Sequence, residues 1–184
     1  MVLETERLVL REFSLDDLED LHRIFGDPLN RKYFPDEGAS KERCQKIIER
    51  MIKCYAEIGY GFWAPVLKEN QEMIGLIGIN KFEYDVPFDP KIEVGWTVDH
   101  KYAGKGLATE AARGCLQYGF ETLGMDEITA ITTPTNTPSR RVMEKLGMTF
   151  DPSVNFWHPK VDKDNPLGET ILYRIKKHEA AVWA

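Results

Sequence analysis

The feature that most constrains this chain is a strand, a glycine-rich turn and a helix that follow one another in its middle. The apolar segment Ile92–Val98 reads as a strand, and its central Gly95 suggests a β-bulge or a close backbone approach. The turn Lys101–Gly106 follows, and then a helical pattern of apolar residues over 107–120. Unpaired N–H groups at a helix start carry partial positive charge, and glycines let an anion approach them closely. This order of elements predicts a phosphate site at the turn.

Two common phosphate-binding motifs do not fit this turn. A P-loop needs Ser or Thr after its lysine, whereas Gly106 follows Lys105 here. The dinucleotide fingerprint needs a third Gly or Ala, and counted from Gly104 the required position holds Thr109. On the local pattern alone, a tight connection without a ligand is the alternative interpretation.

The remaining patterns predict strands and helices around this centre. Further strands are expected at 7–13, 61–67, 73–82, 127–133, 150–156 and 169–176, and further helices at 14–26, 40–58 and from about 139 to 146. The turn-forming run Lys68–Gln71 predicts a hairpin between the second and third of these strands. Because no repeat or long linker interrupts the chain, we expect one domain over 1–184.

Composition narrows the classes of function. The formal net charge of -6 argues against nucleic-acid binding without sequence specificity, which needs a basic face. No apolar run reaches the roughly 18 residues of a membrane span, and the start lacks the pattern of a signal peptide, so we expect a cytoplasmic protein with no membrane partner. The three cysteines, Cys44, Cys54 and Cys115, lack metal-ligand spacing, which predicts reduced thiols and no metal site.

Two motifs carry a resemblance to a known family. They read Lys101-x-x-Gly104-x-Gly106-x-Ala108-Thr109-Glu110-Ala111 and Asn136-x-x-Ser139-x-Arg141-Val142-Met143-Glu144-Lys145-Leu146-Gly147-Met148. With the opening Glu4–Arg11 and the strand Glu93–Trp96, the chain resembles the GNAT N-acetyltransferase superfamily, in its RimJ/RimL-like branch of ribosomal-protein N-terminal acetyltransferases. The resemblance implies an α/β (α+β) fold. Its mixed, mostly antiparallel sheet would have about six to seven strands, the fourth and fifth splayed apart, with about four flanking helices.

The resemblance also implies that acetyl-CoA is the cosubstrate. Its pantetheine arm is expected along Trp96, Thr97 and Val98 like an added strand, and bonded to Asn136. Its pyrophosphate is expected over the turn, where the matching positions are Lys101, Tyr102, Ala103, Gly104, Lys105, Gly106, Leu107 and Ala108, with backbone donors from Tyr102 onward. Lys101 replaces the usual Arg or Gln, so it retains charge without the planar guanidinium. For Asn136 the alternative interpretation is a simple helix cap.

Three catalytic roles follow from the same resemblance. Glu93 is the candidate base, acting through water, although a lone strand glutamate is more often structural or solvent-facing. A backbone N–H near Trp96 or Thr97, freed by the suspected bulge, is the expected oxyanion donor. Ser139 is the candidate acid, with a capping role as its alternative. Many relatives have a tyrosine further along this helix, but here the segment 142–144 has none.

The implied reaction is direct transfer of acetyl to a primary amine while both substrates are bound. The acceptor could be a protein N-terminus or a small molecule such as a polyamine, an amino acid or an aminoglycoside. The absent tyrosine leaves a second interpretation, an acyl-CoA sensor without turnover. The resemblance also allows a homodimer. The long loop 157–167, with His158, and the aromatic Tyr33, Phe34, Trp63 and Tyr84 are candidates for the acceptor pocket, although packing is the default role for each.

Overall fold

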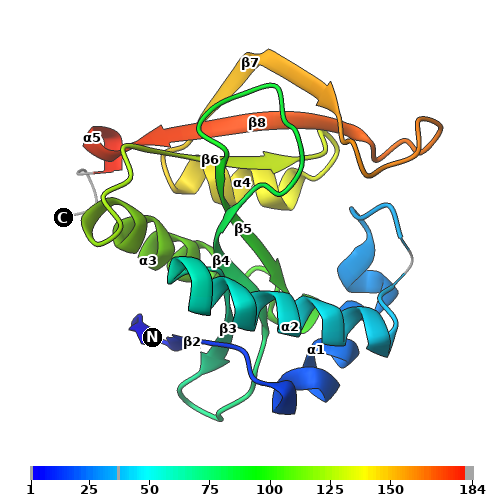
Figure 1. The fold of residues 1–184 in the computed structure, drawn as a ribbon, viewed down its shortest axis with the longest axis vertical. Helices are drawn as coiled ribbons and strands as arrows, with labels where there is room; N and C mark the ends of the chain where they lie inside the picture. The colour runs from blue at the N-terminus through cyan, green and yellow to red at the C-terminus, as the bar shows by residue number, and fades with distance from the viewer. Residues whose placement is uncertain (1, 37, 181–184) are drawn as a thin grey trace.

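One sheet of eight strands, in the order β1-β2-β3-β4-β5-β6-β8-β7, forms the centre of the molecule (Figure 1). The computed structural model describes residues 2–36 and 38–180, so the outermost positions of the expected 1–184 domain lie outside the described residues. The strands are β1 (Val2–Glu4), β2 (Leu8–Arg11), β3 (Phe62–Leu67), β4 (Gly75–Lys81), β5 (Ile92–Val98), β6 (Glu127–Thr132), β7 (Thr149–Trp157) and β8 (Glu169–Lys176). Neighbouring strands are antiparallel except β5 and β6, which run parallel.

Helices cover both faces of this sheet (Figure 1). The α-helices are α1 (Leu18–Phe25), α2 (Lys41–Ile58), α3 (Leu107–Glu121), α4 (Thr137–Lys145) and α5 (Lys177–Ala180), and the 3-10 turns are η1 (Leu15–Asp17), η2 (Pro28–Arg31) and η3 (His100–Tyr102). Buried side chains of α1 and α2 form one core with β3, and those of α3 and α4 form another on the opposite face. Within the described residues, no helix is long and apolar enough to cross a membrane.

The expected fold class is confirmed, and the expected number of strands was too low. The extra strand is β1, whose three residues are too few to show an alternating pattern. The helix beyond the expected four is α5, which is four residues long. The hairpin of β3 and β4 is antiparallel as predicted.

Short-range signals in the sequence mark the ends of α2 and the start of η2. The Ser40 side chain accepts the backbone N–H of Arg43 at 3.3 Å and caps α2, and Gly59 ends that helix. After α1, the Asp27 side chain accepts the Leu29 N–H at 2.9 Å and starts η2. These elements therefore follow from short-range chemistry.

The predicted bulge near Gly95 is wrong. The ladder between β4 and β5 runs without a register shift from the pair Gly75–Val98 to the pair Lys81–Ile92. A Cβ atom on Gly95 would lie 3.0 Å from Cε1 of Phe62, so glycine leaves room for the aromatic ring that packs against this strand.

On its other edge, β5 meets β6 at a single pair, Glu93 with Thr129. The Thr129 hydroxyl donates to the Ile92 carbonyl at 2.6 Å and fixes this contact. Beyond it the two strands diverge, as Figure 1 shows. The expected splay of two neighbouring strands is confirmed, between the strands numbered β5 and β6.

We predict that Gly95→Ala destabilises the fold by about 1–3 kcal/mol, because the new methyl group would crowd the Phe62 ring. Urea denaturation of the single variants and of Gly95→Ala/Phe62→Leu would test this. The smaller leucine should recover part of the loss. Equal stability of Gly95→Ala and the original protein would contradict the packing role of this glycine.

Candidate functional site

The divergence of β5 from β6 exposes a strip of strand backbone. Phe82 N–H donates to the Lys91 carbonyl, and Asp99 N–H donates to Ile74, so the odd-numbered positions of β5 direct their backbone groups toward β4. The even-numbered Trp96 and Val98 therefore direct theirs toward β6, where the described ladder has ended. This strip can pair with an extended ligand as a further strand would. Thr97 was predicted to contact the pantetheine arm together with Trp96 and Val98, but its backbone groups are directed toward β4.

The turn before α3 has a backbone conformation that glycine adopts readily. Gly104 has φ 76° and Gly106 has φ 79°, both in the left-handed region. A Cβ on Gly104 would meet nothing within 4 Å, so its φ angle, rather than crowding, favours glycine. Gly106 is the N-cap of the 15-residue α3, whose first N–H groups therefore open onto this turn.

Some backbone N–H groups of the turn donate to protein acceptors and others do not. Tyr102 N–H donates to the Asp99 carbonyl and Ala103 N–H to that of His100, both at 2.9 Å, while Lys105 N–H has a long 3.4 Å contact. In the described part of the chain, no protein acceptor is found for the N–H groups of Gly104, Gly106, Leu107 and Ala108. The predicted set of donors thus narrows to these four, which suit an anion.

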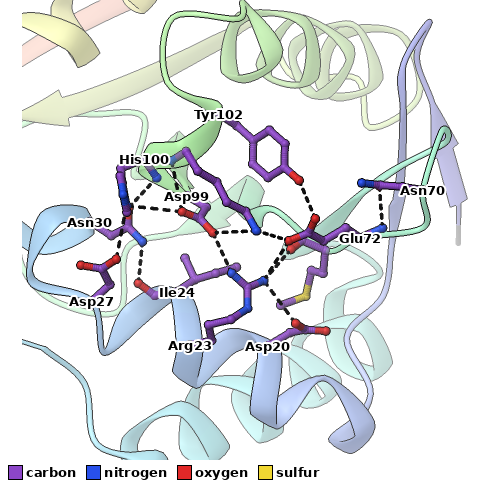
Figure 2. Close-up of polar contacts among 12 residues, drawn as sticks. Asp20, Arg23, Ile24, Asp27, Asn30, Asn70, Glu72, Asp99, His100 and Tyr102 are labelled. Carbon is purple, nitrogen blue, oxygen red and sulfur yellow. Dashed lines mark hydrogen bonds and ion pairs between the residues drawn. The ribbon is translucent and has the colours of Figure 1, made fainter.

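A network of charged side chains fixes the start of this turn against α1 (Figure 2). Arg23 donates to the buried Asp99 carboxylate at 2.7 Å and also contacts Asp20 and Glu72 at 3.2 and 3.5 Å. Burial acts to raise the pKa of Asp99, but hydrogen bonds from Arg23 and the Lys101 N–H outweigh it and hold that pKa below its usual value. Asp99 therefore stays ionised at neutral pH.

Lys101 belongs to the same network. Its ammonium group pairs with Glu72 and lies 3.7 Å from Asp99, and Tyr102 donates its hydroxyl to Glu72 at 2.6 Å. The hydrogen bonds from Lys101 and Tyr102 lower the pKa of Glu72. The Lys101 side chain is thus engaged by carboxylates, and a contact with phosphate stays a prediction.

A second clamp, which no sequence pattern indicated, joins the turn to the segment between β1 and β2. Arg7 donates to the Lys105 carbonyl at 3.0 Å and pairs with Glu110 at 2.6 Å, and the Thr5 hydroxyl donates to Glu110 at 2.7 Å. Glu110 lies in the first turn of α3. Because Arg7 and Glu110 are 103 residues apart, no local pattern could have paired them.

Glu93 lies where β5 and β6 separate, so the structure places it beside the exposed strip as expected. Burial raises its pKa to about 7, against opposing effects from a hydrogen bond to Asn80 and the positive charge of Arg50. Asn80 lies directly across from Glu93 on β4, and Arg50 comes from α2. A carboxylate with this pKa can exchange protons near neutral pH.

Asn136 and Ser139 lie at the start of α4, beyond the end of β6. The Asn136 side chain accepts the Ser139 N–H at 3.2 Å, so the capping interpretation of Asn136 is observed. The carboxamide nitrogen of Asn136 can still serve as a donor. The neighbouring Arg140 donates to the Tyr173 hydroxyl at 3.2 Å and to the Pro134 carbonyl at 3.3 Å, so its side chain is held within the protein.

The long loop between β7 and β8 is ordered by its own turns and contacts two other loops. Successive turns order it, and the Asn165 side chain donates to the Pro35 carbonyl at 3.2 Å, which joins it to the segment after η2. Its His158 contacts the Tyr84 hydroxyl at 2.9 Å. Trp63, by contrast, is a core residue.

The described residues contain no group of three or more His, Cys, Asp or Glu side chains that could hold a metal ion. Cys44, Cys54 and Cys115 are all free thiols. Burial raises the pKa of Cys115, which disfavours its reactive thiolate form.

Comparison with known proteins identifies a family that this chain matches. The family model described as "Acetyltransferase (GNAT) domain" matches residues 7–149. The chain is 29% identical to the uncharacterized N-acetyltransferase YnaD of Bacillus subtilis over 97% of this chain and 99% of that protein. It is 31% identical to the uncharacterized N-acetyltransferase p20 of Bacillus licheniformis, over 78% and 80% of the two chains.

A solved structure agrees with these relatives. The GNAT-family acetyltransferase from Bacillus anthracis superposes with a TM-score of 0.79 at 28% identity, over 97% of this chain and 99% of that one.

We predict that Glu93→Gln stabilises the fold at pH 8 by about 1–3 kcal/mol and leaves it nearly unchanged at pH 4.5. The folded protein holds a proton on Glu93 up to about pH 7. The unfolded chain releases it near pH 4.5, so stability falls as pH rises between these values. Urea denaturation at both pH values would measure the difference, with Glu69→Gln on the exposed β3–β4 turn as control. A pH-independent effect of Glu93→Gln would contradict the raised pKa.

Proposed function

This chain belongs to the GNAT family of acetyltransferases, and we propose that it moves acetyl from acetyl-CoA directly onto a primary amine while both substrates are bound. Acetyl-CoA is the cosubstrate of the family. The observation that carries the proposal is the single-pair contact of β5 with β6, which leaves strand backbone open beside a turn rich in unused N–H groups. An extended, amide-containing arm that ends in a pyrophosphate suits these two features.

Each part of the coenzyme has a matching surface. The pantetheine arm would pair with the backbone of Trp96 and Val98, and the Asn136 carboxamide nitrogen would donate to one of its carbonyl groups. The pyrophosphate would receive the N–H groups of the turn between Gly104 and Ala108. The Arg7–Glu110 clamp and the Arg23–Asp99 pair would keep that turn in place, so less ordering is needed on binding.

The proposed chemistry needs a base, a hydrogen-bond donor for the oxyanion and a source of a proton for the thiolate. Glu93 would take a proton from the bound ammonium through water, and the freed nitrogen would attack the thioester carbonyl. The Trp96 N–H, which faces away from β4, would stabilise the oxygen as it gains charge. The carbon–sulfur bond then breaks, giving the N-acetyl amine and the coenzyme thiolate.

The thiolate would take up the second nitrogen proton through Ser139 or water. The Ser139 hydroxyl has no protein partner among the described contacts and lies at the start of α4. A thiol with an ordinary pKa of about 8.5 is also a tolerable leaving group without an enzymatic acid. This accounts for turnover in a chain whose α4 has no tyrosine.

We predict that coenzyme binding depends on the turn backbone more than on Lys101. Gly106→Ala should weaken coenzyme A binding about tenfold, because alanine favours leaving the left-handed region by about 1–2 kcal/mol and the relaxed turn must be restored before its N–H groups can bind the pyrophosphate. Lys101→Met should change the affinity by less than about threefold, because Lys101 is held by Glu72. Calorimetric titration of coenzyme A would measure both.

Gly124→Ala is the matched control, because Gly124 has φ 68° and space for a Cβ but lies beyond the far end of α3. It should leave coenzyme affinity unchanged. If Lys101→Met lost as much affinity as Gly106→Ala, the lysine would be a phosphate ligand. Absence of coenzyme binding by the original protein would remove the proposed coenzyme site altogether.

We predict amine-dependent release of free thiol from acetyl-CoA when the protein is offered N-terminal peptides, amino acids, polyamines and aminoglycosides. Glu93→Gln should lower kcat/KM by about 10²–10⁴ and Ser139→Ala by about tenfold, with coenzyme affinity retained. The kcat/KM of the original protein should rise with pH through about 7 as Glu93 ionises.

Glu69→Gln serves as the control and should behave as the original protein does. Full activity of both Glu93→Gln and Ser139→Ala would show that other groups carry the chemistry. Tight coenzyme binding without thiol release for any amine would favour an acyl-CoA sensor over a transferase.

A further inference from the structure

Tyr84 and His158 form a hydrogen-bonded pair on the face of the sheet that Glu93 occupies. The Tyr84 hydroxyl oxygen lies 2.9 Å from Nε2 of His158, and the two ring centres are 4.9 Å apart. The pair joins two loops, since Tyr84 follows β4 and His158 follows β7. His158 N–H donates to the Gly168 carbonyl at 2.8 Å, which holds the base of its loop closed.

The hydrogen bonds fix which nitrogen of His158 carries the proton. The Lys160 backbone N–H donates to Nδ1 of His158 at 3.2 Å, so Nδ1 has no proton of its own. Burial and the charge of Lys160 lower the pKa of His158, which keeps the ring neutral at pH 7. The remaining proton is therefore on Nε2, and His158 donates to the Tyr84 oxygen. The hydroxyl proton of Tyr84 is left to donate to another group.

Tyr84 and Glu93 lie on the same side of the sheet. Side chains alternate along β5, and Val94 is buried in the core of α3, so Glu93 faces the opposite side. Tyr84 packs against the hydrophobic cluster that contains Leu172, and the β8 neighbours of Leu172, Ile171 and Tyr173, belong to the α3 core, so this cluster lies on the other side of the sheet. Both residues also belong to the β4–β5 hairpin. Glu93 pairs with Asn80 of β4, and Tyr84 follows Asn80 by four residues in the connection to β5.

The charges around Tyr84 come from α2, from β5 and from the loops that follow β4 and β7. Arg50 of α2 pairs with Glu83 at 3.1 Å, and the ammonium of Lys160 lies 4.8 Å from the centre of the Tyr84 ring. Burial and then the charge of Glu93 raise the pKa of Tyr84, while Arg50 opposes them. Tyr84 is therefore a neutral hydroxyl at any physiological pH, with Glu93 as a neighbouring carboxylate.

We propose that Tyr84 binds the acceptor amine beside Glu93, and that His158 is a positioning residue that fixes the direction of its hydroxyl. The proposal rests on the amine acetylation proposed above and adds the acceptor-side residues. The hydroxyl of Tyr84 donates to the water that links this amine to Glu93, so the lone pair of the deprotonated amine stays free to attack the thioester. His158 acts on the reaction only through that hydroxyl.

A double-mutant cycle tests this pair, using whichever of an alanine-initiated peptide, lysine, spermidine or kanamycin the original protein acetylates fastest. Tyr84→Phe should lower kcat/KM for the amine about tenfold, with coenzyme A affinity unchanged. His158→Leu should show a similar loss, and His158→Gln, which keeps a donor near Nε2, should retain most activity. The double variant Tyr84→Phe/His158→Leu should be no slower than Tyr84→Phe alone.

Tyr118→Phe on α3 is the matched control and should keep full activity. Nitrogen NMR of the original protein should find the His158 proton on Nε2, a readout that does not depend on turnover. A Tyr84→Phe variant within twofold of the original protein, independent losses in the double variant, or a proton on Nδ1 would overturn the proposal. An original protein that acetylates none of the four amines would overturn the transferase function and this inference with it.

Discussion

The structure depends on the unequal pairing of the two edges of β5. Toward β4 the ladder is continuous over the whole strand, and toward β6 it ends after the single pair of Glu93 and Thr129. A strand inside a sheet normally has both edges paired, because unpaired backbone groups lose hydrogen bonds. Here the continuous ladder to β4 fixes the backbone of β5, so the open edge beyond Glu93 keeps its conformation. Both the exposed backbone and the position of Glu93 follow from this one asymmetry.

The sequence predicted the parts of the site that local chemistry determines. Gly104 and Gly106 were recognisable as a glycine-rich turn ahead of a helical pattern, and in the structure both have left-handed backbone angles. The class of fold and the splayed strands followed from the family resemblance. Gly95 was misread because a glycine within a strand can mean a bulge or close packing, and only the position of the Phe62 ring decides between them.

Contacts between distant segments were beyond sequence reasoning. Arg23 and Asp99 are 76 residues apart, and Tyr84 and His158 are 74 apart. Each of these residues has an ordinary packing or solvent-exposed interpretation when read alone, so neither pairing has a sequence signal. The ion pair of Lys101 was equally unpredictable. The sequence shows the charge of Lys101, but it does not show that the Glu72 carboxylate pairs with it.

The two ends of β5 have opposite electrostatic environments. At the turn that follows β5, dense ion pairing lowers the pKa values of Asp99 and Glu72, so the charges that hold the turn are insensitive to pH near neutrality. Around Glu93, burial acts on each group and favours its neutral form, raising the pKa of Glu93 and lowering that of His158. Fixed charges suit the binding of a pyrophosphate, whose own charge is constant at this pH. Glu93, which gains or loses a proton near neutrality, suits the proposed amine, which must lose a proton before it can react. Because Glu93 lies near the start of β5 and the turn follows the end of that strand, the two requirements are met at separate places.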